Sequence, residues 1–142
     1  MQTIKVQNPQ CFNMIIGHTP TRQTLDSIHD ALCNDYPEIK FGLAFNHPDD
    51  PAHINYIGTD ESLMELAKTN ADTIRIGQTF FLFTEQDGVV NVMKVLKNLP
   101  EIEKIYCATR NEIEVVIIGQ DEKRYIMGLM GDYSNSERSH NC

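Results

Sequence analysis

Apolar residues recur at helical spacing in three stretches of the chain. The first begins at Thr24, a natural N-cap, and Pro37 lies beyond its end. The second opens at residues 59–61, where acidic side chains suit the positive end of the helix dipole. The third starts about Asn91, which most simply caps it, and ends at Pro100. The pattern therefore predicts three helices.

Runs of apolar, β-branched and aromatic residues fill the intervals between these helices. The predicted strands are Asn13–Ile16, Phe41–Phe45, Ile54–Ile57, Thr79–Phe83, Ile105–Ala108, Glu114–Ile118 and Tyr125–Met130. The runs at 80–83 and 125–130 are apolar on both sides, which is typical of strands covered on both faces. The element order is close to ββαββαβαβββ, and strands without a helix between them indicate a mixed sheet. The predicted fold class is α+β or mixed α/β, with about three helices packed on a mixed β-sheet.

The length and composition fit one globular domain. The chain has 142 residues, of which 41 % are hydrophobic and 23 % are charged. We expect residues 1–133 to form a single domain and residues 134–142, which include no aliphatic or aromatic residue, to form a flexible tail. The net charge of −8 argues against binding to nucleic acid or to an anionic membrane. No segment has the pattern of a membrane span or a signal peptide, so we expect a cytoplasmic protein.

The four cysteines are widely spaced and form no CxxC pair. They are Cys11, Cys33, Cys107 and Cys142. Without a secretion signal, this spacing favours reduced thiols over a disulfide framework. Cys107 is more simply a core thiol than a nucleophile.

Three groups of polar residues lie where predicted strands end, and the chain has no GxxxxGK[ST], GxGxxG, GxSxG or HExxH motif. In the first group Gly17 would let backbone approach a ligand, while His18 and Thr19 supply a proton carrier and a hydroxyl. An ordinary strand-to-loop turn with an incidental histidine explains the same residues. Asn91 belongs to a helix end whose amide groups would also bind an anion.

The second group is Thr109, Arg110 and Asn111, which follow the predicted strand 105–108. Ligands of sheets with parallel strands bind beyond the carboxyl ends of the strands, which makes Thr109 and Asn111 candidate contacts. Arg110 is either a phosphate clamp or a solvated side chain. The third group holds Asp132, which is either a general base, a magnesium ligand or an exposed turn residue.

The segment 46–53 is the most turn-rich part of the chain body. It contains His47, Asp49, Asp50 and His53, which are residue types that ligate metals. A hairpin loop between the strands on either side explains the same composition, because Pro and Asp form turns. The spacing matches no specific metal motif.

Several stretches in the same order resemble the adenosine-specific kinases, a small prokaryotic family. Lys40–Phe45 is similar to the family's KFGIAF, and Ile105–Thr109 followed by Asn111 is similar to its IYCATANP. Further similar stretches are 16–19, 24–32, 77–80, 91–101 and 128–130, so the resemblance covers about residues 3 to 132. The apolar positions of this chain match the family's pattern better than its polar positions do. Pro20, Gln23 and Gln78 stand where family members tend to carry His, Lys and His.

The resemblance implies ATP-dependent phosphorylation of the adenosine 5′-hydroxyl, with Mg²⁺ accompanying ATP and no other metal site. It also implies symmetric homo-oligomers, a trimer or a multiple of it. In this hypothesis the catalytic residues are Asp132 and His18. The substrate-binding residues are Gly17, Thr19, Gln78, Asn91, Thr109, Arg110 and Asn111. If the three strands that precede these groups end on the same side of the sheet, the groups converge on one pocket.

Two other hypotheses stand beside this one. The replaced polar positions favour a non-catalytic nucleoside- or nucleotide-binding or assembly protein that kept the scaffold and lost the chemistry. Metal-dependent hydrolysis by His47, Asp49 and His53 is the third. Because Gln78 cannot transfer a proton near neutral pH, we expect nucleoside binding to survive better than catalysis.

Overall fold

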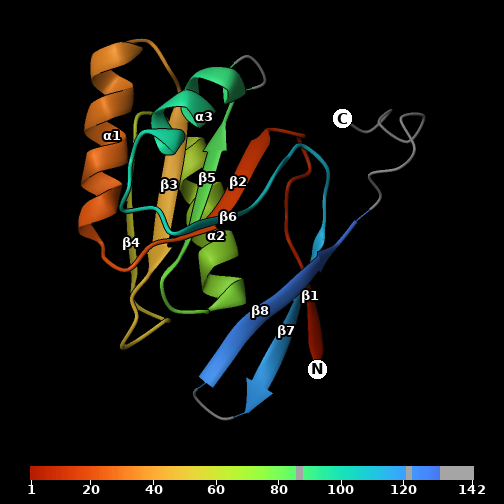
Figure 1. The fold of residues 1–142 in the computed structure, drawn as a ribbon. Helices are drawn as coiled ribbons and strands as arrows, with labels where there is room; N and C mark the ends of the chain where they lie inside the picture. Colours follow the sequence, from red (N-terminus) through yellow and green to blue (C-terminus); the bar gives the residue numbers. More distant parts are fainter. Residues whose placement is uncertain (86–87, 121–122, 132–142) are drawn as a thin grey trace.

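A five-stranded antiparallel sheet forms the centre of the computed structural model, which describes residues 1–85, 88–120 and 123–131 (Figure 1). Its strands are β2 (Asn13–His18), β3 (Phe41–Asn46), β4 (Ile54–Gly58), β5 (Thr79–Thr84) and β6 (Lys104–Thr109), in the order β4-β3-β5-β2-β6. Every pair of neighbours is antiparallel. All six residues of β5 are buried, which confirms the prediction of a central strand with two covered faces.

A second sheet, of three strands, packs beside the first. It contains β1 (Gln2–Lys5), β7 (Glu114–Gln120) and β8 (Lys123–Met130) in the order β1-β7-β8, again with antiparallel pairs. The element order and the α+β class with three helices are confirmed. The strands form two antiparallel sheets where one mixed sheet was expected. Short connections without a crossover helix join β7 to β8 and β3 to β4, and such connections produce antiparallel pairs.

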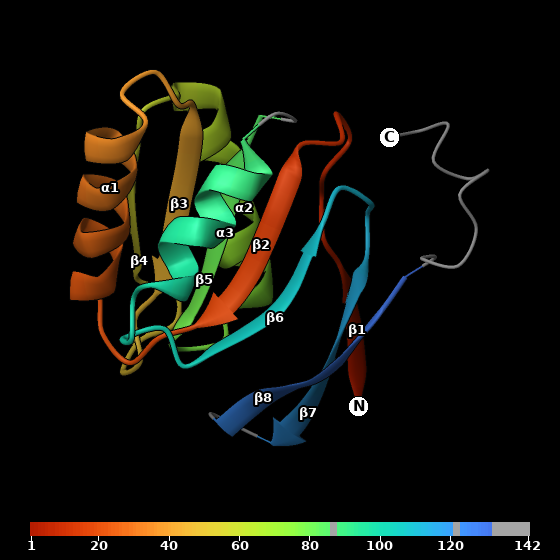
Figure 2. The ribbon, with the colours of Figure 1, turned by 45° about the horizontal axis from the view of Figure 1, so that its top comes forward.

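The helices cover both faces of the five-stranded sheet. Helices α1 (Gln23–Asp35) and α3 (Val89–Lys97) lie on one face, and α2 (Glu61–Ile74) lies on the other (Figure 2). Asp60 caps α2 by accepting the Leu63 N–H at 3.0 Å, close to the predicted start. The other two predicted caps are wrong, because α1 and α3 begin before them. Thr24 and Asn91 therefore lie inside the first turns of α1 and α3.

Alternation along the central strands creates two cores. In β5, Phe80 and Leu82 pack with α1 and α3, while Phe81 and Phe83 pack with α2 and the three-stranded sheet. This is the two-residue period of side chains in a strand. Strand β2 follows the same rule, so that His18 shares the α2 face with Met14 and Ile16.

Strand β8 differs from its prediction. It is an edge strand of the small sheet in the described part of the chain, and only one of its faces is covered. Ile126 and Leu129 pack on the core, whereas Tyr125 and Met127 are each 61 % exposed. An apolar run does not distinguish a buried strand from one with an exposed apolar face.

The cysteine prediction is confirmed in part. Cys33 and Cys107 are free thiols, whereas Cys11 is disulfide-bonded. No helix in the described ranges is long and apolar enough to cross a membrane. Asp132 and the predicted tail at 134–142 lie outside the described residues.

Candidate functional site

His18, the last residue of β2, is held by Glu103 through two contacts. The Glu103 backbone N–H donates to the His18 carbonyl at 3.0 Å, and His18 Nδ1 lies 2.8 Å from Glu103 Oε1. When the imidazole is neutral, a hydrogen bond from Nδ1–H to this carboxylate leaves the lone pair on Nε2. The imidazole is 27 % exposed, so the ring is not closed off from solvent.

Gln78 lies at the same end of the sheet in a strained backbone conformation. Its φ of 66° is in the left-handed region. Its N–H donates to the Asn46 carbonyl at 2.8 Å, its carbonyl accepts the Thr19 N–H at 3.0 Å, and its Nε2 donates to the Pro20 carbonyl at 3.3 Å. Such a conformation costs about 1–3 kcal/mol in a non-glycine residue and persists where the surroundings determine it. Gln78 thus joins β3 to the segment that follows β2.

Two predicted ligand contacts near His18 have structural partners. A Cβ at Gly17 would lie 2.5 Å from the Phe80 ring, so this glycine permits side-chain packing inside the protein. The Thr19 hydroxyl lies 2.6 Å from that of Thr24 and donates to the Glu101 carbonyl at 3.1 Å. Thr19 is fully buried. Its hydroxyl therefore connects β2 to α1 and to the segment before β6.

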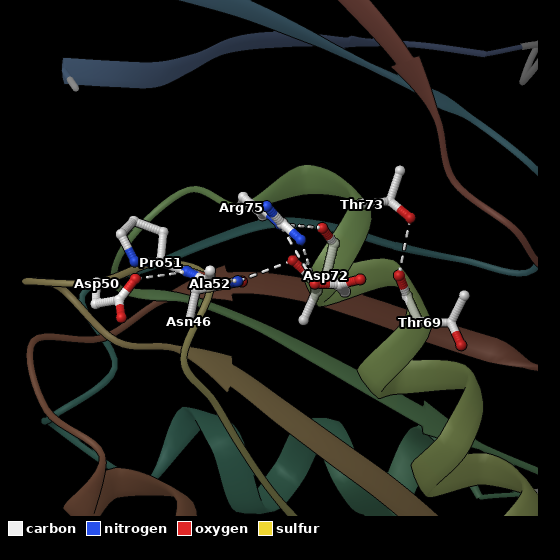
Figure 3. Close-up of polar contacts among 9 residues, drawn as sticks. Asn46, Asp50, Pro51, Ala52, Thr69, Asp72, Thr73 and Arg75 are labelled. Atoms are coloured by element: carbon white, nitrogen blue, oxygen red, sulfur yellow. Dashed lines mark hydrogen bonds and ion pairs between the residues drawn. The ribbon is translucent and has the colours of Figure 1, made fainter. Parts of the chain in front are cut away.

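A row of three polar side chains crosses the α2 face at this end. His18 pairs with Thr79, and Phe45 pairs with Phe80, so Thr79 lies between His18 and Asn46. Asn46 Nδ2 donates to the carbonyls of Pro51 and Ala71 at 2.7 and 2.8 Å, which attaches the loop after β3 to the end of α2 (Figure 3). Asn46 Oδ1 and Thr79 Oγ1 are buried without a hydrogen-bond partner among the described residues.

The loop 47–53 is a hairpin connection and not a metal site. The Asp49 N–H lies 3.3 Å from His47 Nδ1. Asp50 Oδ1 accepts the Ala52 N–H at 3.3 Å, as Figure 3 shows. No group of three or more His, Cys, Asp or Glu side chains in the described ranges is placed to hold a metal ion. The prediction of a metal site from His47, Asp49 and His53 is therefore wrong.

The predicted convergence of the polar groups is also wrong for the described residues. Strands β2 and β6 are antiparallel, so His18 lies opposite Lys104 and Met14 lies opposite Thr109. Thr109–Asn111 is therefore at the other end of the sheet from His18. There the Thr109 hydroxyl accepts the Asn111 N–H at 3.1 Å. The Arg110 carbonyl accepts a hydrogen bond from Asn8 Nδ2 at 3.1 Å.

Asn91 is separated from His18 in the same way. It lines a hollow of about 610 Å³ with Tyr36, Glu38, Lys40 and Glu85. Because the Glu85 carbonyl accepts a hydrogen bond from Asn13 at the start of β2, this hollow is at the far end of that strand. Of the predicted residues that the structure describes, only Gly17, His18, Thr19 and Gln78 lie at this end of the sheet.

A cleft of about 510 Å³ is lined by residues of the edge strands β6 and β8. Figure 2 shows where these two strands lie. Residues 104–108 form one wall and residues 126–129 form the other. Lys104 Nζ lies 4.9 Å from the centroid of the Tyr106 ring. Burial raises the pKa of Tyr106, and it raises the pKa of Cys107 to about 11, so both side chains are neutral in this wall.

Sequence reasoning did not identify Glu103, Lys104 or Tyr106. The only available signal was alternation in β6, which places Lys104 and Tyr106 on one face. Their relation to His18 depends on the pairing of β2 with β6, which no local pattern specifies.

Comparisons with known proteins agree with the fold. The family model described as "Adenosine specific kinase" matches residues 4–140. The crystal structure of the PH1918 protein from Pyrococcus horikoshii OT3 is similar, with a TM-score of 0.82 and 28 % sequence identity. That similarity covers 97 % of this chain and 88 % of the other. Comparison with the curated proteins gave no match.

Proposed function

Because the chain belongs to the adenosine-specific kinase family, we propose that it binds adenosine and transfers the γ-phosphoryl group of ATP to the 5′-hydroxyl. The observation that carries this proposal is the family match, which extends over nearly the whole chain and includes His18 and Gln78. The described surface supports it with a proton acceptor and a cation on neighbouring strands. These are His18 on β2 and Lys104 on β6.

The reaction assigns a role to each of these groups. The adenosine 5′-oxygen attacks the γ-phosphorus of ATP, the bond to the ADP oxygen breaks, and the 5′-hydroxyl proton moves to His18 Nε2. Glu103 holds the ring so that Nε2 is the acceptor. Lys104 places a positive charge beside the transferred phosphoryl group. The products are AMP and ADP.

Magnesium would be supplied with ATP, since Mg²⁺ is commonly bound by substrate phosphates and one or two carboxylates. It neutralises charge on the phosphates. The described residues have no metal-binding cluster of their own, so we assign them no magnesium ligand. Asp132 remains the predicted base or magnesium ligand. Thr109, Arg110, Asn111 and Asn91 remain predicted contacts at the other end of the sheet.

A non-catalytic nucleoside-binding protein is the second candidate. Pro20, Gln23 and Gln78 replace protonatable residues of the family pattern, and Gln78 lies on the same end of the sheet as His18. Losing a general acid–base group typically lowers a rate by about 10²–10⁴-fold, whereas losing a neutral hydrogen bond costs roughly 0.5–1.5 kcal/mol of affinity. We therefore propose a slow kinase whose nucleoside binding is better preserved than its turnover.

We also propose that the protein acts in the cytoplasm as a homo-oligomer, a trimer or a multiple of it. Four exposed apolar side chains on the neighbouring strands β7 and β8 support the assembly. They are Ile118, Tyr125, Met127 and Met130, with exposed fractions of 46, 61, 61 and 53 %.

The test is AMP formation from adenosine and Mg-ATP, followed by chromatography, together with calorimetric binding of adenosine. His18→Asn should lower kcat by about 10²-fold or more. His29→Asn is a matched control, because His29 is 26 % exposed and also lies beside a carboxylate, that of Asp30. Its activity should stay within about twofold of the wild type. Adenosine binding without AMP formation would favour the non-catalytic candidate, and absence of binding would reject the nucleoside class.

A further inference from the structure

The geometry points to the cleft between β6 and β8 as the nucleoside monophosphate site, with the phosphate at Lys104 and the base between the two strands. This inference rests on the proposed function, because it gives the adenosine and AMP of that reaction a position. The cleft volume of about 510 Å³ is in the range of pockets that hold small organic ligands, about 300–1,000 Å³.

Unpaired backbone lies along both walls of this cleft. β6 is the last strand of the five-stranded sheet, and β8 is the last strand of the three-stranded sheet. Within the described ranges, each of these strands therefore has a sheet partner on one side only. Edge strands present N–H and C=O groups in a row. A purine has donors and acceptors along its edge, which are the groups that such a row recognises.

The charge at the mouth of the cleft suits a phosphate. Lys104 has no carboxylate partner in the part of the chain that the structure describes, although the whole chain carries a net charge of −8. The ammonium group of Lys104 contacts the Tyr106 ring. This ring is neutral, so it supplies no negative charge opposite the ammonium group. A phosphate is the ligand group that a lone ammonium binds well.

The interior of the cleft suits a heterocyclic base. Cys107 contributes a neutral thiol because its pKa is raised to about 11, and Ile126 and Leu129 contribute apolar surface. Gly128 contributes no side chain, and a Cβ built there meets no atom within 4 Å. The wall of β8 is therefore open at the point where it faces the ligand.

His18 fixes the direction of the nucleotide in the cleft. It is the cross-strand neighbour of Lys104, and paired residues place their side chains on the same face. The 5′ end therefore lies at His18 and Lys104, and the base lies toward Ala108 and Leu129. In this orientation the proton acceptor and the cation flank the hydroxyl that is phosphorylated.

Variants on the two walls test the site by calorimetric binding of AMP and adenosine. Gly128→Val on β8 and Ala108→Phe on β6 should each lower AMP affinity at least tenfold, since each adds bulk to one wall. Lys104→Met should weaken AMP binding by about tenfold while adenosine binding changes less than threefold, because only AMP carries a phosphate. Matched controls are Ala52→Phe in the loop after β3 and Lys97→Met on α3, both exposed and outside the cleft. Thermal unfolding verifies that each variant is folded.

The outcomes separate this inference from the proposed function. AMP affinity unchanged in folded Gly128→Val and Ala108→Phe would overturn the cleft as the site, even if the wild type phosphorylates adenosine. AMP binding that both wall variants abolish would support the site, even if no turnover is found. A wild type that binds neither adenosine nor AMP would overturn the inference directly.

Discussion

His18 and Glu103 contact each other through both backbone and side chain, with the Glu103 N–H 3.0 Å from the His18 carbonyl and the carboxylate 2.8 Å from Nδ1. The backbone hydrogen bond fixes the position of the Glu103 main chain. The Glu103 side chain therefore loses little further conformational freedom when its carboxylate contacts Nδ1. This makes Glu103 a positioning residue for the proposed proton acceptor.

Replacing Glu103 should therefore affect turnover more than binding. In Glu103→Gln we expect kcat to fall by about tenfold and the KM for adenosine to change less than twofold, because the amide does not hold Nδ1–H as strongly as a carboxylate does. Glu103→Asp should recover part of kcat. The neighbouring Glu101→Gln is the control, since Glu101 is exposed and accepts the Thr19 hydroxyl with its backbone carbonyl and not with its carboxylate. Equal losses in both glutamine variants would remove Glu103 from the mechanism.

Gln78→Gly should stabilise the protein by roughly 1 kcal/mol, since glycine adopts a φ of 66° without the steric cost that glutamine carries. The backbone hydrogen bonds to Asn46 and Thr19 remain available to glycine. The measurement is the free energy of unfolding from urea titration.

A second left-handed residue provides the comparison for Gln78. Arg75 has a φ of 50°, and its Nη2 lies 3.0 Å from Asp72 Oδ1 (Figure 3). Arg75→Gly gains the same backbone relief but loses this contact, so its net gain should be smaller. A loss of stability in Gln78→Gly would show that its Nε2 contact with Pro20 outweighs the strain.

The sequence predicted elements better than it predicted their assembly. Phe80–Phe83 is apolar on every position, and the structure buries it on both faces at the centre of a sheet. Tyr125–Met130 has a similar pattern, yet β8 is an edge strand with Tyr125 exposed. The difference depends on which strands are neighbours, and this is a property of the whole chain.

The candidate site was predicted in part for the same reason. His18 and Thr19 were identified because they lie where a strand ends, and Gln78 was identified from the family pattern. The three do lie together. Thr109 was assigned to the same pocket on the assumption of parallel strands, whereas the antiparallel register places it opposite Met14. Register is set by tertiary pairing and not by residue spacing.

Cys107 should react slowly with alkylating reagents in the folded protein. Burial raises the pKa of its thiol from 9.0 to about 11, and only the thiolate is nucleophilic. At pH 8 we expect alkylation by iodoacetamide to be about 100-fold slower than for the same cysteine in urea, as measured by mass spectrometry. The rate should rise about tenfold per pH unit up to pH 10.

The same shift predicts how stability depends on pH. Between pH 9 and 11 the unfolded chain has lost the Cys107 proton that the folded chain retains, so unfolding releases a proton. The contribution of Cys107 to stability is therefore complete below pH 9 and declines as the pH rises toward 11. Cys107→Ala should show a weaker decline in this interval. An identical pH dependence in the two proteins would contradict a buried thiol.

The outer face of the small sheet should carry the contact between copies of the chain. Ile118 and Tyr125 are cross-strand partners, and Met130 is a further exposed apolar residue of β8. In a single copy of the chain this surface is exposed to water. Its burial against another copy would contribute about 25 cal/mol to the free energy of association for each Å² covered. Light scattering of the wild type at micromolar concentration should give three times 16.2 kDa or a multiple of that mass.

The double variant Ile118→Ser/Tyr125→Ser should shift that mass toward 16.2 kDa without lowering the melting temperature of the single chain, because both side chains are exposed. The matched control is Tyr56→Ser/Val90→Ser, which removes two side chains of similar exposure, 51 and 62 %, from other parts of the surface. The control should keep the mass of the wild type. If both double variants dissociate the assembly equally, the contact is not specific to this face. If the wild type is itself a monomer, the apolar face of β7 and β8 has no partner copy.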